Sequence, residues 1–77
     1  MKLVRIDASL VAARVREVRD HLKQTQADLA ASLGISQSSL THYETGRRPL
    51  PVEVAAKLAH ASGFRLDWLY GLRDNKR

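Results

Sequence analysis

The chain has 77 residues, which is enough for one small domain and leaves no room for a second lobe or a deep catalytic cleft. Hydrophobic residues make up 44% of the sequence and are spread along it, which argues against disorder and against a membrane span of about 20 apolar residues. There are no cysteines, which excludes disulfides and thiolate metal sites, so we expect a cytoplasmic protein.

Positive charge lies towards the two ends of the chain. The formal net charge is +5, with a net of +3 over residues 1–23 and +4 over residues 47–77. The centre, residues 24–46, contains no Lys or Arg and is slightly acidic. A basic chain of this kind suits a polyanionic partner, although charge alone does not identify one.

The first predicted element is a helix of about four turns, which Asp7 or Ser9 can cap at its start. Its inner face is an apolar stripe at helical spacing, made of Val11, Val15, Val18 and Leu22. Residues 1–7 are predicted to form an N-terminal arm, extended over residues 2–6.

Two short helices follow, joined by a tight turn at residues 34–36. Thr25 can cap the first, and Gly34 can end it because glycine adopts the left-handed conformation at little steric cost. Ser36 can cap the second, which is expected to end at Gly46. So short a connection makes the second helix leave at a steep angle, the geometry of a helix-turn-helix.

Residues 47–51 contain two prolines and are predicted to be a loop. Pro51 suits the first turn of a fourth helix, which Gly63 ends. The buried stripe of that helix is expected to contain Val54, Ala55, Leu58, Ala59 and Ser62.

A short fifth helix is predicted over residues 66–70, with Trp68 and Leu69 as its apolar anchors. The sequence thus predicts an all-α domain of five helices over residues 8–72, followed by a polar tail over residues 73–77.

Six residues at fixed offsets from Gln26 carry the helix-turn-helix pattern: Leu29, Ala30, Gly34, Ile35, Leu40 and Tyr43. Ala30 must be small because the two helices nearly touch there, and Gly34 makes the turn. Ile35 and Leu40 fill the wedge between the helices. One such match is a weak signal, whereas six together are a strong one.

Residues 25–30 (TQADLA) and 43–47 (YETGR) resemble the phage repressor and Cro (XRE-type) family of helix-turn-helix regulators. Residues 64–71 (FRLDWLYG) resemble the fifth helix of prophage-type members, with Arg65 where a capping Ser or Thr is usual. The resemblance implies a five-helix, lambda-repressor-like domain. It also implies a transcriptional repressor that binds a two-fold symmetric operator in double-stranded DNA as a homodimer.

The resemblance also implies which residues contact DNA. The base contacts would be Gln37, Ser38, Thr41 and His42 on the recognition helix. Gln37 is the sharpest candidate because its amide can pair with both N6 and N7 of adenine. The phosphate contacts would be Thr25, Gln26, Thr45, Arg47 and Arg48. Gln26 opens a helix, where the dipole and free backbone amides favour a phosphate.

Two further roles are structural. Arg19 and Glu44 match a pair that links the first helix to the end of the recognition helix, and we expect a largely buried ion pair. Trp68, Leu69 and Leu72 exceed what one small core needs and are predicted to form the dimer interface.

Other interpretations of these residues stay open. Without the helix-turn-helix geometry, Gln37, Ser38 and Thr41 would be read as a solvated helix face, and His42 as a surface residue. Trp68 could stack on bases, although its spacing favours core or dimer packing.

Catalysis is not expected. Ser38, His42 and Glu44 include the residue types of a hydrolytic triad, yet Glu44 is rotated away from His42 on a helix. No metal or cofactor site is predicted, because the three histidines have no paired carboxylate motif.

An alternative function is the antitoxin of a toxin–antitoxin pair, which binds a protein partner and its own promoter. An apolar surface left uncovered on the arm, or on Trp68, Leu69 and Leu72, would favour this alternative. No membrane partner is expected in either case.

Overall fold

The computed structural model describes residues 5–77, and within them the only regular elements are five helices. These are α1 (Ala8–Leu22), α2 (Gln26–Leu33), α3 (Gln37–Glu44), α4 (Val52–Ser62) and α5 (Leu66–Leu69). The predicted all-α fold with five helices is therefore confirmed. Residues 1–4, most of the predicted arm, lie outside the described part of the chain.

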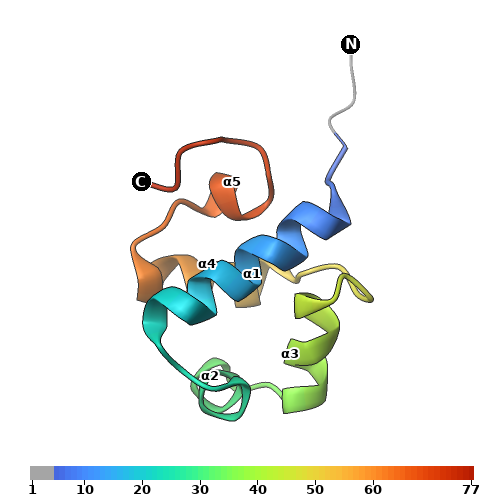
Figure 1. The fold of residues 1–77 in the computed structure, drawn as a ribbon, viewed down its shortest axis with the longest axis vertical. Helices are drawn as coiled ribbons and strands as arrows, with labels where there is room; N and C mark the ends of the chain where they lie inside the picture. The colour runs from blue at the N-terminus through green and yellow to red at the C-terminus, as the bar shows by residue number, and fades with distance from the viewer. Residues whose placement is uncertain (1–4) are drawn as a thin grey trace.

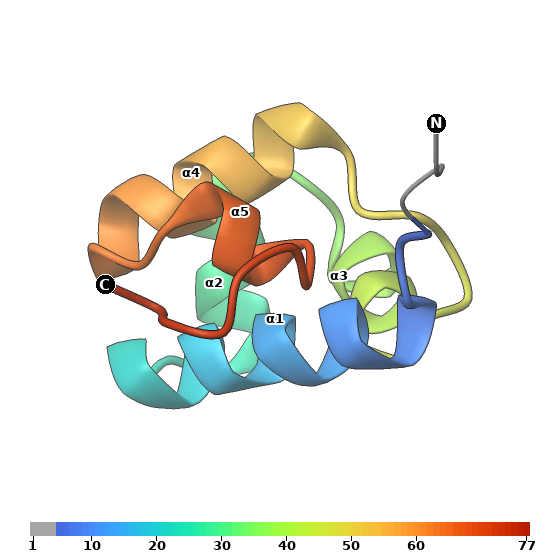
Figure 2. The ribbon, with the colours of Figure 1, turned by 90° about the horizontal axis from the view of Figure 1, so that it is seen from above.

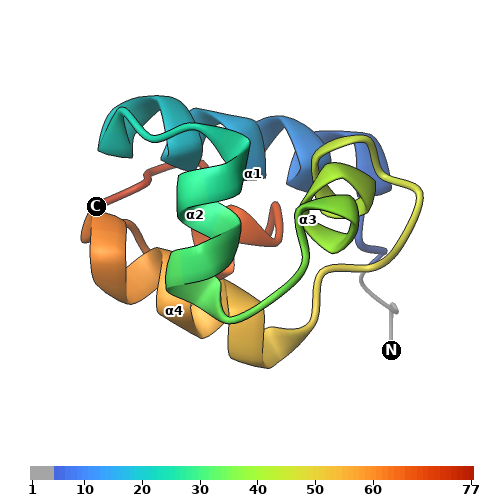
Figure 3. The same ribbon diagram turned by 90° about the horizontal axis from the view of Figure 1, so that it is seen from below.

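Helices α1 and α4 form the middle of the domain, and the other three pack on its two sides. Seen from above, α5 lies over the space between α1 and α4 (Figure 2). Seen from below, α2 crosses from α1 to α4 on the opposite side, with α3 beside it (Figure 3). Helix α1 contacts α3, α4 and α5, so it is shared by both sides of the domain (Figure 1).

The first three helices begin at side-chain caps, as predicted. The carboxylate of Asp7 accepts hydrogen bonds from the amides of Ser9 and Leu10, at 3.0 and 3.2 Å. The hydroxyls of Thr25 and Ser36 each accept one from the amide three residues on, at 3.1 and 3.0 Å. Each bond satisfies an amide that has no partner within its helix.

Helices α4 and α5 begin without a side-chain cap. Pro51 stands just before α4 rather than within its first turn. The guanidinium of Arg65, before α5, lies 3.1 Å from the Asp67 carboxylate, which also accepts a bond from Arg73 at 3.0 Å. The hydrogen bond from Arg65, and to a smaller extent that from Arg73, lowers the pKa of Asp67 to about 2.

Helix α3 ends differently from its neighbours. Helices α1, α2 and α4 are each followed by a residue in the left-handed conformation, as Gly34 is after α2 with φ of 72°. Helix α3 ends at Glu44, and Thr45 after it is right-handed. The predicted terminator, Gly46, lies in the turn beyond, with φ of 75°. It turns the chain away without capping α3.

The core contains apolar residues from all five helices, and it includes two that were expected elsewhere. Trp68 and Leu69 are only 3% and 1% exposed, so their predicted place at a dimer interface is wrong. The Trp68 ring meets Phe64 edge-on, with centroids 5.3 Å apart, and Arg14 covers it. The small core uses both large side chains. Leu72, in contrast, is 51% exposed.

The predicted polar tail folds back against the domain. The amide of Arg65 donates to the carbonyl of Lys76 at 2.7 Å, and the Lys76 ammonium lies 2.5 Å from the Glu17 carboxylate. Arg14 of α1 donates to the carbonyl of Arg73 at 3.1 Å. Residues 73–77 are therefore attached to α1 and to the start of α5.

Tyr70 ties the end of α5 to the loop before α4, because its hydroxyl donates to the carbonyl of Leu50 at 2.7 Å. Burial raises the pKa of this hydroxyl. We expect Tyr70→Phe to lower the free energy of unfolding by about 1 kcal/mol, since a partly buried carbonyl loses its donor. Urea unfolding measures the change. Tyr43→Phe is the control, because the Tyr43 hydroxyl donates no hydrogen bond within residues 5–77. Equal stability of both variants and the parent would show that the bond contributes nothing.

Candidate nucleic-acid interface

The turn between α2 and α3 is fixed by backbone hydrogen bonds and by close packing. The amide of Ile35 donates to the carbonyl of Ala30 at 3.0 Å, and that of Gly34 to Ala31 at 3.2 Å. Ala30 is 2% exposed, and Leu40 of α3 is fully buried. Helix α3 consequently leaves α2 at a steep angle and presents its outer face away from the core (Figure 3).

The outer face of α3 carries the predicted base contacts. Gln37 and Ser38 are exposed, and Thr41 and His42 are partly exposed one turn later. Residues of this face and of the next loop line a shallow hollow, formed by Ser38, Thr41, His42, Thr45 and Arg47. The structure thus brings three of the four predicted base contacts and two predicted phosphate contacts to one hollow, and Gln37 stands exposed at the start of the same helix.

The hydroxyl groups on this surface differ in what they can offer to DNA. The Thr41 hydroxyl donates to the carbonyl of Gln37 at 3.0 Å, and that of Thr45 donates to Thr41 at 2.8 Å. A hydroxyl has one proton, so both present only acceptor lone pairs outward. Phosphates accept hydrogen bonds, so Thr45 must rotate to bind one. Thr25 accepts from the Asp28 amide and keeps its proton free.

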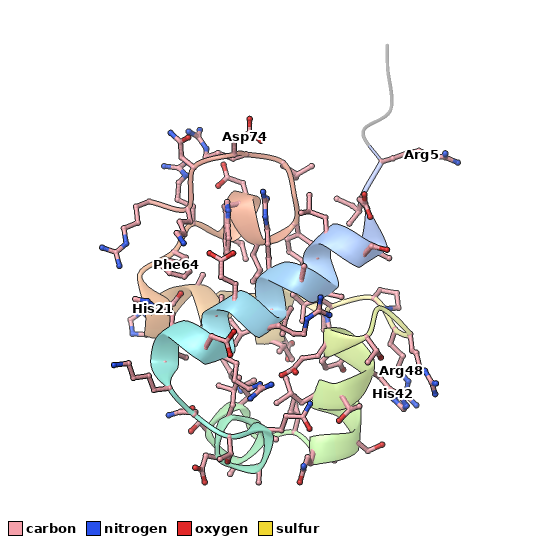
Figure 4. The ribbon with its side chains drawn as sticks, in the orientation of Figure 1. Arg5, His21, His42, Arg48, Phe64 and Asp74 are labelled. Carbon is pink, nitrogen blue, oxygen red and sulfur yellow. The ribbon has the colours of Figure 1, made fainter. Side chains whose placement is uncertain are left out.

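His42 also has one atom that is closed to DNA. Its Nδ1 is buried and has no hydrogen-bond partner within residues 5–77. Contact with a base or a phosphate must therefore be made by Nε2. Figure 4 shows His42 on the same side of the molecule as Arg48.

The side chain of Gln26 points towards α3, which the sequence could not indicate. Its amide nitrogen donates to the Glu44 carboxylate at 3.1 Å, and its oxygen lies 3.4 Å from the Thr41 hydroxyl. One amide proton and the backbone amides of the first turn of α2 remain for a phosphate.

Glu44 lies where α1, α2 and α3 meet. Its carboxylate is held by Arg19 of α1 through two bonds, Nε to Oε2 at 2.8 Å and Nη2 to Oε1 at 3.2 Å. Glu44 is 2% exposed, whereas 24% of the Arg19 side chain is accessible. The hydrogen bond that Arg19 donates to Glu44 raises the pKa of Arg19.

Arg47 and Arg48 extend the same surface beyond the end of α3. Both are exposed, and neither forms an ion pair within residues 5–77. Their amides donate to the carbonyl of His42 at 2.9 and 3.4 Å, which holds the loop against the helix. Two free guanidinium groups therefore stand beside the neutral face of α3.

Two residues that sequence reasoning missed hold the helix-turn-helix from outside. Lys57 of α4 donates to the carbonyl of Leu33, at the end of α2, at 3.0 Å. Arg16 of α1 donates to the carbonyl of Glu44, at the end of α3. Cations are favourable at the negative ends of helices. The sequence gives no signal for these bonds, because they depend on how the helices are placed.

A model of the helix-turn-helix family matches residues 15–69, which is most of the chain and includes both helices of this surface. The chain belongs to the helix-turn-helix family. A crystal structure of the restriction-modification controller protein C.AhdI from Aeromonas hydrophila superposes with a TM-score of 0.72 and 27% sequence identity. The match covers 86% of this chain and all of that one.

These findings confirm the resemblance to Cro- and repressor-type regulators, and the five-helix fold that it implied. The protein is a DNA-binding transcriptional regulator. Its family and its fold are both those of DNA-binding regulators. None of the helices within residues 5–77 is long and apolar enough to span a membrane.

The Arg19–Glu44 pair should be asymmetric in its effect on stability. Arg19→Met leaves the carboxylate of Glu44 buried and without its ion-pair partner, so we expect a decrease of about 3 kcal/mol in unfolding free energy. Glu44→Gln should cost less, because the exposed part of Arg19 can be hydrated. The double variant should be more stable than Arg19→Met alone. Chemical denaturation of the four proteins measures these differences.

The opposite order would contradict this account of the pair. If Arg19→Met were no less stable than the parent, the ion pair would contribute no more than one on the surface.

Proposed function

We propose that the protein is a repressor that reads a two-fold symmetric operator in double-stranded DNA as a homodimer, with no catalytic activity of its own. It would act in the cytoplasm. The observation that carries the proposal is the exposed neutral face of α3, with Thr45 directly after it, placed beside the free guanidinium groups of Arg47 and Arg48. Neutral amides and hydroxyls discriminate bases, and cations attract the backbone.

Gln37 is the residue proposed to read a base. It is the first residue of α3 and is exposed, so its amide can reach a base edge without moving the helix. Recognition helices of this kind contact bases through their N-terminal residues. An amide pairs best with adenine, which has an acceptor and a donor side by side in the major groove.

Thr25, Gln26, Arg47 and Arg48 are the residues proposed to contact phosphates. Their groups come from the start of α2 and from the loop after α3. Thr45 would join them only after its hydroxyl turns away from Thr41. The likeness to a restriction-modification controller protein, which is matched over its whole length, supports a regulatory role for this chain.

Selection of bound sequences from random duplex DNA tests the proposal. We expect enrichment of a palindrome whose half-sites are about one helical turn, or about 34 Å, apart. An A·T pair facing Gln37 is expected in each half-site. Enrichment of no sequence would contradict sequence-specific binding, and a single unrepeated half-site would contradict the dimer.

Attraction and reading should be separable by mutation. Arg47→Ala should weaken binding to the selected duplex and to a scrambled one, and should lower the salt slope by about 0.9 for each phosphate that the variant no longer neutralises. Gln37→Ala should leave the slope unchanged and reduce the preference at one base pair in each half-site by about 1–3 kcal/mol. Titrations of both duplexes at several salt concentrations measure the two effects.

Equal weakening on both duplexes by Gln37→Ala would contradict its role as a reader. Specificity would then fall to Ser38 and His42, which line the hollow on α3. An unchanged salt slope for Arg47→Ala would remove it from the phosphate contacts.

The proposed dimer uses an apolar surface formed by Ile6, Leu10, Tyr70 and Leu72. Ile6 and Leu72 are each 51% exposed, and the other two are partly buried. Ile6 and Tyr70 line one hollow of about 340 Å³, and the Leu10 side chain packs closely against Gly71, the residue before Leu72. Tyr43 of α3 also lines the hollow, so the surface adjoins the recognition helix.

A second copy is the occupant that best fits this surface. Reading a palindrome needs two recognition helices related by a two-fold axis, and this surface lies beside α3. A toxin would be the occupant under the alternative function, since an antitoxin would present the same apolar residues to another protein.

We expect Leu72→Glu to convert the dimer to a monomer, because a charge would be buried in an apolar interface. Sedimentation velocity across a range of concentrations measures the change. Val52→Glu is the control, since Val52 is 65% exposed on α4 and lies outside this surface. A parent protein that sediments as a monomer, free and on DNA, would contradict the dimer and leave the surface to a different partner.

A further inference from the structure

Two arginines of α1 hold the same residue at the end of the recognition helix. Arg19 binds the carboxylate of Glu44, and Arg16 donates to its backbone carbonyl. The two lie three residues apart and so share one face of α1. Arg19 has a counter-charge to neutralise, whereas Arg16 is exposed and forms no ion pair within residues 5–77. The arrangement does not need Arg16 for charge balance.

The end of α3 explains what Arg16 does. After α2, Gly34 is in the left-handed conformation and its amide donates to two carbonyls, those of Ala30 and Ala31. After α3, Thr45 is in the right-handed conformation and its amide donates only to the carbonyl of Thr41. The last four carbonyls of a helix have no partner within it. The carbonyl of His42 is bonded by the amides of Arg47 and Arg48. Arg16 supplies the donor for Glu44.

The position of this carbonyl matters for DNA binding. Thr41, His42 and Thr45 lie in the last turn of α3 or directly after it, and Arg47 begins the basic loop two residues later. If the last turn frays, the reading face and the groups proposed to bind phosphates both move. A helix of eight residues has only about two turns, so such fraying would affect half of it.

We propose that Arg16 is a positioning residue for DNA recognition: its guanidinium caps the C-terminus of α3 and thereby sets specificity without contacting DNA. This inference rests on the proposed sequence-specific binding. It assigns part of the specificity to α1, outside the helix-turn-helix itself. The guanidinium acts through its N–H donors, and its charge is secondary.

Two variants separate these contributions. Arg16→Ala removes donor and charge. Arg16→citrulline, made by chemical synthesis of the 77-residue chain, removes the charge but keeps one terminal NH2 donor, because an oxygen replaces only the other NH2 group of the guanidinium. Arg77→Ala is the charge-matched control, because Arg77 lies over the Phe64 ring, away from α3. The probes are the duplex selected from random DNA and its scrambled counterpart.

The first measurement needs no DNA. We expect Arg16→Ala to speed hydrogen exchange of the Thr45, Arg47 and Arg48 amides by about tenfold, because the last turn opens more often. The citrulline variant and Arg77→Ala should exchange like the parent. Unchanged exchange in Arg16→Ala would overturn the proposal, whatever the protein binds.

The second measurement is DNA affinity. Arg16→Ala should lower the ratio of selected to scrambled affinity by about tenfold with a salt slope like that of Arg77→Ala, and citrulline should restore the ratio. A slope reduced by about 0.9 per site, with equal weakening on both duplexes, would show that Arg16 neutralises a phosphate and would overturn the proposal. If random selection yields no preferred duplex, the proposed function fails while the exchange result still decides the role of Arg16 in α3.

Discussion

The buried carboxylate of Glu44 is the constraint on which the DNA-binding surface depends. A charge that is 2% exposed must be paired and hydrogen-bonded, or it costs several kcal/mol. Arg19 of α1 and Gln26 of α2 meet this need, and both can do so only when α1, α2 and α3 are correctly placed. The pair therefore selects one arrangement of three helices, while apolar packing alone would tolerate small displacements.

The same constraint explains how charge is divided along the chain. Residues 24–46 contain no Lys or Arg, so the recognition helix cannot bind DNA through charge and depends on correct placement. Placement comes from neighbouring helices, through Arg16 and Arg19 of α1 and Lys57 of α4. Neutral groups bind DNA weakly unless held in place, but once held they discriminate well, because a wrong base leaves them unpaired.

Features fixed by neighbouring residues could be predicted from the sequence. The caps at Asp7, Thr25 and Ser36, and the turn at Gly34, depend on a few adjacent residues and are confirmed by the structure. Contacts between distant segments could not be predicted, because helical periodicity gives a face but not its partner. Helical spacing cannot tell core from interface, so the sequence predicted a dimer interface for Trp68, which the structure buries in the core. The inward turn of Gln26 and the cap from Arg16 are further examples.

Helix α1 connects the two tasks that a dimeric reader of a palindrome must combine. Arg16 and Arg19 fasten it to the end of α3, and Arg14 fastens it to the carbonyls of Trp68 and Arg73, beside Leu72 of the proposed dimer surface. In a dimer, the distance between the two recognition helices depends on how α3 is connected to the dimer surface within each subunit. In the proposed dimer α1 would be part of that connection in both subunits, so a shift of α1 would change the spacing of the half-sites twice over. The arginines of α1 would then set the separation of the two half-sites, while α3 would contact the bases within each.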